Sequence, residues 1–401
     1  MLTIQMDMLQ TAALAMLLFL LGRFVVNHVE FLQRCCIPAP VVGGLIFAIL
    51  HLITYQAGIV TFTFDETLKT AFMDFFFTSV GFGASIKLLK KGAWPVILFL
   101  ILATIMVTMQ DIVGVGLAGV FGLDGRLGLC MGSIPLVGGH GTSASFGQTF
   151  VDAGLDNALV VAVACATYGL VAGSLMGGPL GRWKIKKYGL KPSADALESD
   201  LEEPETVYVT KAAKLDSNTF LDAFVLLIIA TGVGTYITNA LAKVHITLPV
   251  YIGGMIVAVI IRNVADAMGK ELPLKAIDVA GNTCLNVFLG IALMTLMLWQ
   301  LASLALPIIV ILAIQTVIMY LYASNVVFRV MGGDYEAAVM TAAFCGFGMG
   351  ATPNAMANML TIKNKYGPAP KAFFVVPLVG GMFIDFTNAA VITIFTNLVA
   401  R

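Results

Sequence analysis

Charged residues are scarce in this chain of 401 amino acids. Asp, Glu, Lys and Arg make up 11% of it, whereas hydrophobic residues make up 59% and the mean hydropathy is +0.93. Soluble domains carry about 25% charged residues, so this composition indicates a membrane protein. The 23 basic residues balance 23 acidic ones, and zero net charge offers no basic face for nucleic acid.

Patterns typical of disulfides, metal sites and leader peptides are missing as well. The six cysteines include no Cys-x-x-Cys pair and mostly lie inside apolar stretches, so we expect free thiols. No Lys or Arg precedes Arg23, and no small-residue cleavage site follows the first apolar stretch. We therefore interpret that stretch as a first membrane helix rather than a cleaved signal.

Long apolar stretches are abundant instead. A membrane-spanning helix needs about 20 mostly apolar residues, and we predict an all-α polytopic membrane protein with ten such helices. They are expected at about 9–29, 38–57, 68–86, 94–121, 156–181, 218–242, 248–262, 276–300, 303–329 and 370–398. Two further apolar stretches, at about 126–152 and 335–361, are rich in glycine and polar at their centres.

One long hydrophilic segment, 182–217, divides the chain into parts 1–181 and 218–401 with five predicted spans each. We place this segment in the cytoplasm and let each glycine-rich stretch return to the side of the membrane from which it enters. With this arrangement, 18 Lys and Arg residues face the cytoplasm and four face outside. Basic residues concentrate in cytoplasmic loops. We therefore predict two re-entrant hairpins, a cytoplasmic central loop and external termini.

The two parts resemble each other at a constant offset. Gly43 in VVGGLIFAI and Gly253 in YIGGMIVAV lie 210 positions apart, and Asp124 matches Asp334 at the same offset. Because each part has an odd number of spans, the second part enters the membrane in the opposite orientation. Inverted repeats with interrupted segments at matching positions are typical of secondary transporters.

The hairpin centres read GGHGTSASF (138–146) and CGFGMGATPNAMANM (345–359). Glycine lets the backbone approach a ligand closely. Broken helices expose N–H groups that attract anions and carbonyls that bind Na+. Because irregular backbone inside a membrane must be buried or line a wet cavity, we expect the two tips to meet near the midplane and form a ligand site.

These two motifs, together with VPLVGGMFIDFTNA (376–389), closely resemble the bacterial sodium/glutamate symporter family over essentially the whole chain. The resemblance implies a transporter and not an enzyme, with Na+-coupled uptake of glutamate across the bacterial inner membrane. It also implies a homodimer and elevator-like movement of a transport domain against a scaffold. Na+ is then the coupling ion, no organic cofactor is needed, and the partners are L-glutamate and membrane lipid.

Glutamate has two carboxylates and one ammonium, so its site needs anion-binding groups and one counter-charge. For the first tip we assign Gly141, Thr142 and Ser143 to substrate binding. Thr352 and Asn354 take the same role at the second tip. The alternative is that these hydroxyls and amides only cap broken helices.

Charged side chains inside membrane spans are costly and usually functional. Asp385 precedes Asn388 by one helical turn on the same face, and we assign both to the substrate ammonium or to Na+. The alternative is a hydrogen bond that only fixes helix packing. Asp111, which follows Gln110, is assigned to Na+ or to a structural contact, and Asn358 is a further candidate Na+ ligand.

His140 has two candidate roles in the first tip. It could relay a proton and couple transport to H+, or it could form a hydrogen bond to a substrate carboxylate or to the hairpin backbone. Gly350 stands at the matching position of the second part, so hairpin geometry does not require a histidine. We favour the hydrogen bond and count His140 among the substrate-binding candidates.

Three other functions remain open from the sequence. A symporter for another small carboxylate or amino acid, driven by Na+ or H+, would differ only near the tips. A membrane-embedded hydrolase is disfavoured because GTSAS departs from G-x-S-x-G and no metalloprotease, P-loop or dinucleotide motif occurs. A channel needs a continuous pore, which hairpins from two sides oppose.

Overall fold

The computed structural model describes residues 2–35, 37–87, 93–193, 217–242, 250–298 and 304–399. Residues 194–216 of the predicted central loop and the terminal residues 1, 400 and 401 lie outside this part of the chain. So do the ends of the predicted spans at 248–262 and 276–300. The chain forms two compact units. Unit 1 comprises Met1–Gly83, His140–Ala164 and Asp216–Leu306; unit 2 comprises Ala84–Gly139, Cys165–Leu215 and Pro307–Arg401.

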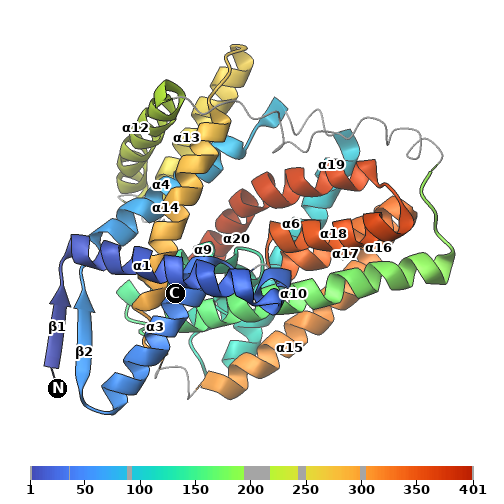
Figure 1. Ribbon diagram of the computed structural model, residues 1–401. Coiled ribbons are helices and arrows are strands. Elements are labelled where there is room, and N and C mark those ends of the chain that lie inside the picture. The colour runs from blue at the N-terminus through green and yellow to red at the C-terminus, as the bar shows by residue number, and fades with distance from the viewer. Residues whose placement is uncertain are drawn as a thin grey trace. The chain divides into compact units, whose positions relative to one another are not determined.

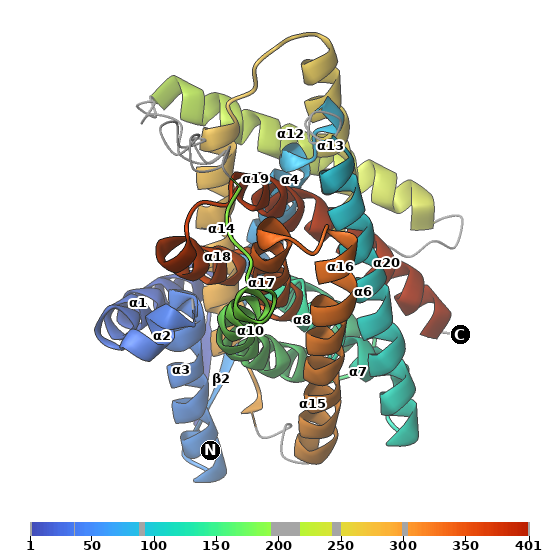
Figure 2. The same cartoon turned by 90° about the vertical axis from the view of Figure 1, so that its right-hand side faces the viewer.

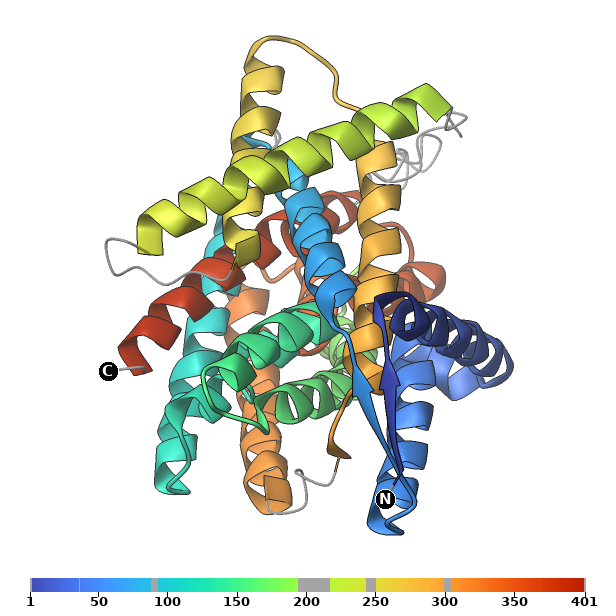
Figure 3. The same cartoon turned by 90° about the vertical axis from the view of Figure 1, so that its left-hand side faces the viewer.

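Unit 1 combines three long helices from each half of the sequence with the second arm of the first glycine-rich segment. Its helices are α1 (Met8–His28), α2 (Glu30–Arg34), α3 (Ala39–Gln56), α4 (Thr67–Gly83), α9 (Gly139–Asp152, from His140 on), α12 (Ser217–Ala242), α13 (Val250–Ala267) and α14 (Leu274–Met294). Figure 3 shows α12 lying across α4, α13 and α14. Apolar side chains of these four helices, Phe82, Leu227, Val257 and Ile277 among them, form one buried cluster.

Glycine pairs let the helices of unit 1 approach closely. A Cβ on Gly43 would lie 1.9 Å from the carbonyl oxygen of Leu18, and one on Gly253 would lie 2.1 Å from that of Gly234. Real Cβ atoms do not come so near to backbone. Both glycines therefore serve helix packing, as small residues do in membrane proteins.

Two short strands in unit 1 depart from the predicted all-α class. β1 (Leu2–Met6) and β2 (Val60–Phe64) pair in parallel, with Leu2 opposite Val60 and Met6 opposite Phe64, and they lie side by side in Figure 1. VTFTF alternates β-branched and aromatic residues, which favours a strand. The prediction missed this pattern because it is only five residues long and borders an apolar span.

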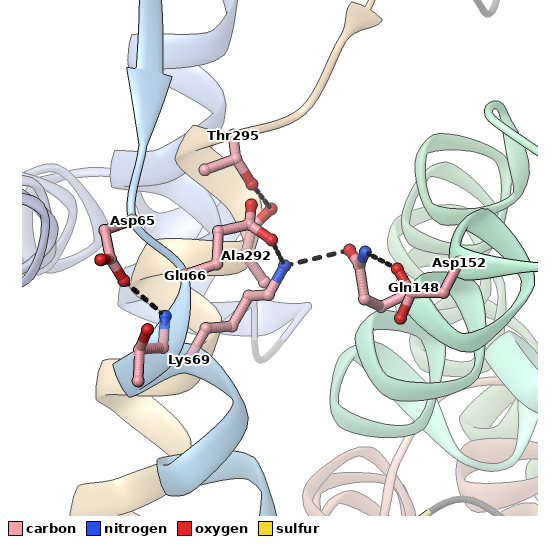
Figure 4. Close-up of polar contacts among 8 residues, drawn as sticks. Asp65, Glu66, Lys69, Gln148, Asp152, Ala292 and Thr295 are labelled. Carbon is pink, nitrogen blue, oxygen red and sulfur yellow. Dashed lines mark hydrogen bonds and ion pairs between the residues drawn. The ribbon is translucent and has the colours of Figure 1, made fainter. Parts of the chain in front are cut away.

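A buried cation links α4 to α9 within unit 1 (Figure 4). The ammonium of Lys69, a residue only 3% exposed, forms an ion pair with Glu66 and donates to Oε1 of Gln148 at 3.0 Å. Nε2 of Gln148 donates in turn to Oδ1 of Asp152 at 2.8 Å. Lysine is rarely buried without such partners, so this network fixes the end of α9 against the first turn of α4.

Unit 2 contains the interrupted helices. Its elements are α6 (Ala93–Val120), α7 (Gly125–Leu129), α8 (Ser133–Leu136), α10 (Ala158–Tyr188, from Cys165 on), α15 (Ala305–Tyr322, from Pro307 on), η3 (Ala323–Val327), α16 (Phe328–Val330), α17 (Tyr335–Met349), α18 (Thr352–Tyr366), α19 (Pro370–Leu378), η4 (Val379–Phe383) and α20 (Ile384–Val399). α6 and α15 run side by side (Figure 2), and the Tyr322 hydroxyl donates to the Leu102 carbonyl at 2.9 Å.

Two matching aspartates begin helices of unit 2. Asp124 caps α7 by accepting from the backbone N–H of Arg126 at 2.8 Å, and Asp334 caps α17 by accepting from that of Ala337 at 2.7 Å. Such caps satisfy N–H groups that the first helical turn leaves open. Side-chain hydrogen bonds from Arg126 lower the pKa of Asp124 and keep this cap charged.

The structure is a mostly helical, multi-pass membrane protein. Among the described residues, seven helices are long and apolar enough to cross a membrane, and the bent pair Pro370–Gly381 and Ile384–Val399 would make an eighth. Two of the ten predicted spans fall short of this measure. They are α4, which has 17 residues, and α13.

Candidate functional site

Four breaks in three segments of unit 2 supply the backbone of a candidate site. The second glycine-rich segment forms two helices, α17 and α18, which are separated at Gly350 and Ala351. The bent pair turns by 41° at η4, a π-helical stretch. The first glycine-rich segment breaks around Gly132 and again before Gly139. Such irregular turns often mark functional positions.

The second helical hairpin is closely packed and tied to the bent helix. A Cβ on Gly346 of α17 would lie 2.5 Å from the backbone nitrogen of Ala355 in α18, so only glycine allows this approach. The hydroxyl of Thr352, the first residue of α18, donates to the carbonyl of Gly380 in η4. The tip of the hairpin is therefore fastened to the π-helical stretch.

The break points of the two glycine-rich segments are neighbours within unit 2. Gly139 has a φ of +62°, which disfavours any residue with a side chain, and a Cβ there would lie 3.4 Å from the carbonyl oxygen of Gly350. Residues 211 positions apart in the sequence are thus in contact.

Asp111 on α6 holds the start of α8. Its side chain is fully buried; Oδ1 accepts from the backbone N–H of Ser133 at 2.8 Å and Oδ2 accepts from the Ser133 hydroxyl at 3.0 Å. Nδ2 of Asn388 on α20 donates to the Ser133 carbonyl at 3.4 Å. Two separate helices, α6 and α20, therefore converge on Ser133.

Two buried glutamines lie at the same place. Nε2 of Gln110 donates to the carbonyl of Gly348 at 2.8 Å, next to the tip of the second hairpin. Nε2 of Gln315 on α15 donates to the carbonyl of Gln110 at 2.7 Å and lies 3.5 Å from the carbonyl oxygen of Met131. Both amide groups therefore contact backbone beside a helix break.

Asp385 is the second residue of α20 and follows η4 directly. Its side chain is partly buried, and it makes no hydrogen bond or ion pair with the part of the chain that the structure describes. A carboxylate in this position is free to bind a cationic group. Asn388, one turn later, keeps its buried Oδ1 without a hydrogen-bond partner in that same part.

Asn354 and Asn358 of the second hairpin contact α10. Nδ2 of Asn354 donates to the carbonyl of Leu170 at 2.9 Å. Nδ2 of Asn358 donates to the carbonyl of Gly173 at 3.0 Å, and its Oδ1 accepts from the backbone N–H of Gly178 at 3.2 Å. Both ends of the Asn358 amide are engaged in packing, whereas Oδ1 of Asn354 has no hydrogen-bond partner among the described residues.

The remaining predicted substrate residues lie in α9 of unit 1. They are His140, Gly141, Thr142 and Ser143. A Cβ on Gly141 would lie 3.2 Å from the ring of Phe76 on α4. The Ser143 hydroxyl is buried and has no hydrogen-bond partner among the described residues. The structure therefore packs this tip against helices of its own unit.

Ser133 and Gly380 are site residues that the sequence did not predict. Ser133 is a polar residue inside the apolar stretch LGLCMGSIPLV and follows a glycine, which is a usable signal for a helix break. Gly380 acts through its backbone carbonyl, and the glycine pair in VGGMF was the signal available for it. Their partners, Asp111 and Thr352, were both identified.

The arrangement offers oxygen ligands for a hard monovalent cation. Across the described residues no three His, Cys, Asp or Glu side chains lie close enough together to hold a metal ion. Instead, the carboxylates of Asp111 and Asp385 lie on segments that also present amide and backbone carbonyl oxygens. Soft transition metals prefer thiolate and imidazole, whereas carbonyls at broken helices bind Na+.

Known proteins are similar to nearly the whole chain. Residues 4–368 match the sequence model of a family described as Sodium/glutamate symporter. The sodium/glutamate symporter of Escherichia coli (strain K12) is 41% identical over 396 residues, covering 98% of both chains. That of Haemophilus influenzae (strain ATCC 51907 / DSM 11121 / KW20 / Rd) is 38% identical over 389 residues, covering 96% of both. The sodium proton antiporter MjNhaP1 of Methanocaldococcus jannaschii has a TM-score of 0.43 at 14% identity, over 98% of this chain and 99% of that chain.

Proposed function

The chain belongs to the sodium/glutamate symporter family, and from this premise we propose that it couples Na+ entry to the uptake of L-glutamate across the bacterial inner membrane. Transport proceeds by alternating access. The observation that carries the proposal is the gathering of helix breaks around the buried carboxylate of Asp111 in unit 2, where Gly139 adjoins Gly350 and Asp111 holds Ser133.

Na+ is the coupling ion in this proposal. Asp111 supplies charge at the first break, and Asn388 supplies an amide oxygen that lacks another partner in the described part of the chain. Asp385 is a second carboxylate on the same helix as Asn388. Asn358 is a weaker candidate ligand because its oxygen already accepts from Gly178.

Glutamate binds at the second tip. Thr352 begins a helix of 15 residues, and the open N–H groups of its first turn favour a carboxylate. Asn354 adds an amide in that turn, and Asp385 pairs with the substrate ammonium if Na+ does not occupy it. For Gly141, Thr142, Ser143 and His140 the substrate-binding roles rest on the sequence.

Helix bounds support two inverted halves, 1–181 and 218–401. α7 and α17 begin 210 residues apart, at Gly125 and Tyr335, and α10 and α19 begin 212 apart, at Ala158 and Pro370. This near-constant spacing across different elements supports ten spans and two re-entrant hairpins. We also propose a cytoplasmic 182–217 loop, external termini, a homodimer in membrane lipid and elevator-like movement, which follow from charge bias and family membership.

Uptake into proteoliposomes tests the function. Labelled L-glutamate is offered to the purified, reconstituted protein under an inward Na+ gradient, a K+ gradient or a proton gradient, with unlabelled aspartate, citrate or glutamine as competitors. We expect accumulation that only Na+ drives and that only glutamate analogues block. Accumulation driven by protons, or competition by citrate, would assign another symport reaction. Flux that follows the glutamate gradient alone, without accumulation, would indicate a channel.

A further inference from the structure

Gln110 and Gln315 contact helix breaks that belong to opposite halves of the sequence. Gln110 comes from the first half of the sequence and donates to Gly348 in the second half. Gln315 comes from the second half, and its amide lies against Gln110 and Met131 in the first half. Both side chains are fully buried. Each glutamine therefore contacts backbone beside the break of the other half.

These contacts determine which way each amide faces. A backbone carbonyl accepts hydrogen bonds only, so the NH2 group of each glutamine must face it and the side-chain oxygen must point elsewhere. Oε1 of Gln110 and Oε1 of Gln315 are both buried without a hydrogen-bond partner in the described part of the chain. Buried polar atoms are normally paired, so two such oxygens in one place call for a ligand.

An acidic side chain lies at the same break. Gln110 directly precedes Asp111, and a Cβ on Gly132 would lie 2.7 Å from Oδ1 of Asp111 and 3.1 Å from the carbonyl oxygen of Gln110. The unpartnered Oδ1 of Asn388 is on a side chain that bonds to the next residue, Ser133. Asp111 and Asn388 therefore both bond to Ser133, and the Gln315 amide lies 3.5 Å from the carbonyl oxygen of Met131. Gln110 adjoins them, because it precedes Asp111 and its backbone carbonyl accepts from Gln315.

We propose that Gln110 and Gln315 are cation ligands, whose Oε1 atoms complete a Na+ site with Asn388 and Asp111 at the 131–133 break. The identity of the cation rests on the proposed function. Amide oxygens do not take up protons at ordinary pH, so they bind Na+ without competing for H+. Because the same amide group of Gln110 donates to Gly348, an occupied site also steadies the second hairpin next to its tip.

Na+ binding to the purified protein without glutamate tests this site. The thermal midpoint is measured while NaCl replaces KCl at constant ionic strength, for wild type, Gln110→Leu and Gln315→Leu. Loss of one oxygen ligand should raise the half-saturating Na+ concentration by about tenfold or more. Gln33→Leu is the matched control, because Gln33 also donates to backbone carbonyls, at 2.9 Å, but is exposed on α2. It should respond to Na+ as wild type does.

A structural role alone would lower the midpoint equally in NaCl and KCl and leave half-saturation within about twofold of wild type; that result would overturn the assignment. If a leucine variant fails to fold, Gln110→Asn or Gln315→Asn replaces it. Asparagine is one methylene shorter than glutamine, so it moves the side-chain oxygen away from the site and should raise the half-saturating Na+ concentration in the same way. Suppose that wild type shows Na+-driven uptake and that the thermal midpoint of every variant depends on Na+ as that of wild type does. The assignment of Gln110 and Gln315 as cation ligands then fails, whereas the proposed function stands. If wild type shows neither a Na+-dependent thermal midpoint nor Na+-driven uptake, the cation site and the proposed function both fail.

Discussion

A single carboxylate, Asp385, carries the clearest prediction at the residue scale. It is partly buried inside a membrane helix and has no partner in the described part of the chain, a costly arrangement unless a cation binds there. Asp385→Asn should therefore abolish Na+-driven glutamate uptake in proteoliposomes while gel filtration shows an assembled protein.

Asp222→Asn is the matched control for Asp385→Asn, because Asp222 is an exposed carboxylate on α12. We expect it to transport as wild type does. Wild-type uptake by Asp385→Asn would reduce that residue to a packing role.

Ser133 is a second residue-scale test, since both its N–H and its hydroxyl bond to the Asp111 carboxylate. A hydrogen bond to a buried charge contributes about 1.5–3 kcal/mol, so Ser133→Ala should lower the free energy of unfolding by that order. In an Asp111→Asn background the loss should shrink, because the two residues interact directly. Denaturant unfolding of the four proteins measures the coupling.

The control for Ser133→Ala is Thr108→Ala, since the Thr108 hydroxyl donates to the Thr104 carbonyl within its own helix, α6. If Ser133→Ala lowered the free energy of unfolding equally in the wild-type and Asp111→Asn backgrounds, the serine would act independently of the Asp111 carboxylate.

At the scale of elements, the close contact of α17 and α18 requires glycine at position 346. A methyl group there would overlap the backbone nitrogen of Ala355, and backbone cannot move aside as a flexible side chain can. Gly346→Ala should therefore lower stability by about 1–3 kcal/mol and weaken glutamate binding by displacing the tip. Thermal unfolding and equilibrium binding measure the two effects.

Gly119→Ala provides the control in an equally apolar helix. A Cβ at Gly119 would meet nothing within 4 Å, and alanine favours helix over glycine by about 1 kcal/mol. We expect unchanged or slightly higher stability. If Gly346→Ala were also tolerated, the two hairpin arms would not pack as described.

Helices were easier to predict than their contacts, for a physical reason. α6 was expected at 94–121 and occupies Ala93–Val120, because a long apolar stretch in a membrane has few other stable forms. The contact between Asp111 and Ser133, and that between Asn358 and Gly173, join segments far apart in sequence. Such pairs depend on tertiary packing, which hydropathy along one stretch does not record.

At the scale of the whole molecule, the two compact units each draw helices from both halves of the sequence. The sequence indicated a division at the hydrophilic segment 182–217, because a long charged segment between apolar stretches is easily recognised in a sequence. The grouping of helices into units follows from which apolar faces pack together, and this information is distributed over all 401 residues. The constant offset of 210 positions between the two halves was the sequence feature that came nearest to indicating this grouping.

The central claim is that Na+ and glutamate bind to the same protein with mutually dependent affinities. Thermodynamic linkage requires that Na+ raise glutamate affinity by the factor by which glutamate raises Na+ affinity. Isothermal titration of L-glutamate into the purified protein, at a series of Na+ concentrations with K+ holding ionic strength constant, measures this directly. We predict a dissociation constant that falls steadily as Na+ replaces K+. A dissociation constant independent of Na+ would contradict the account.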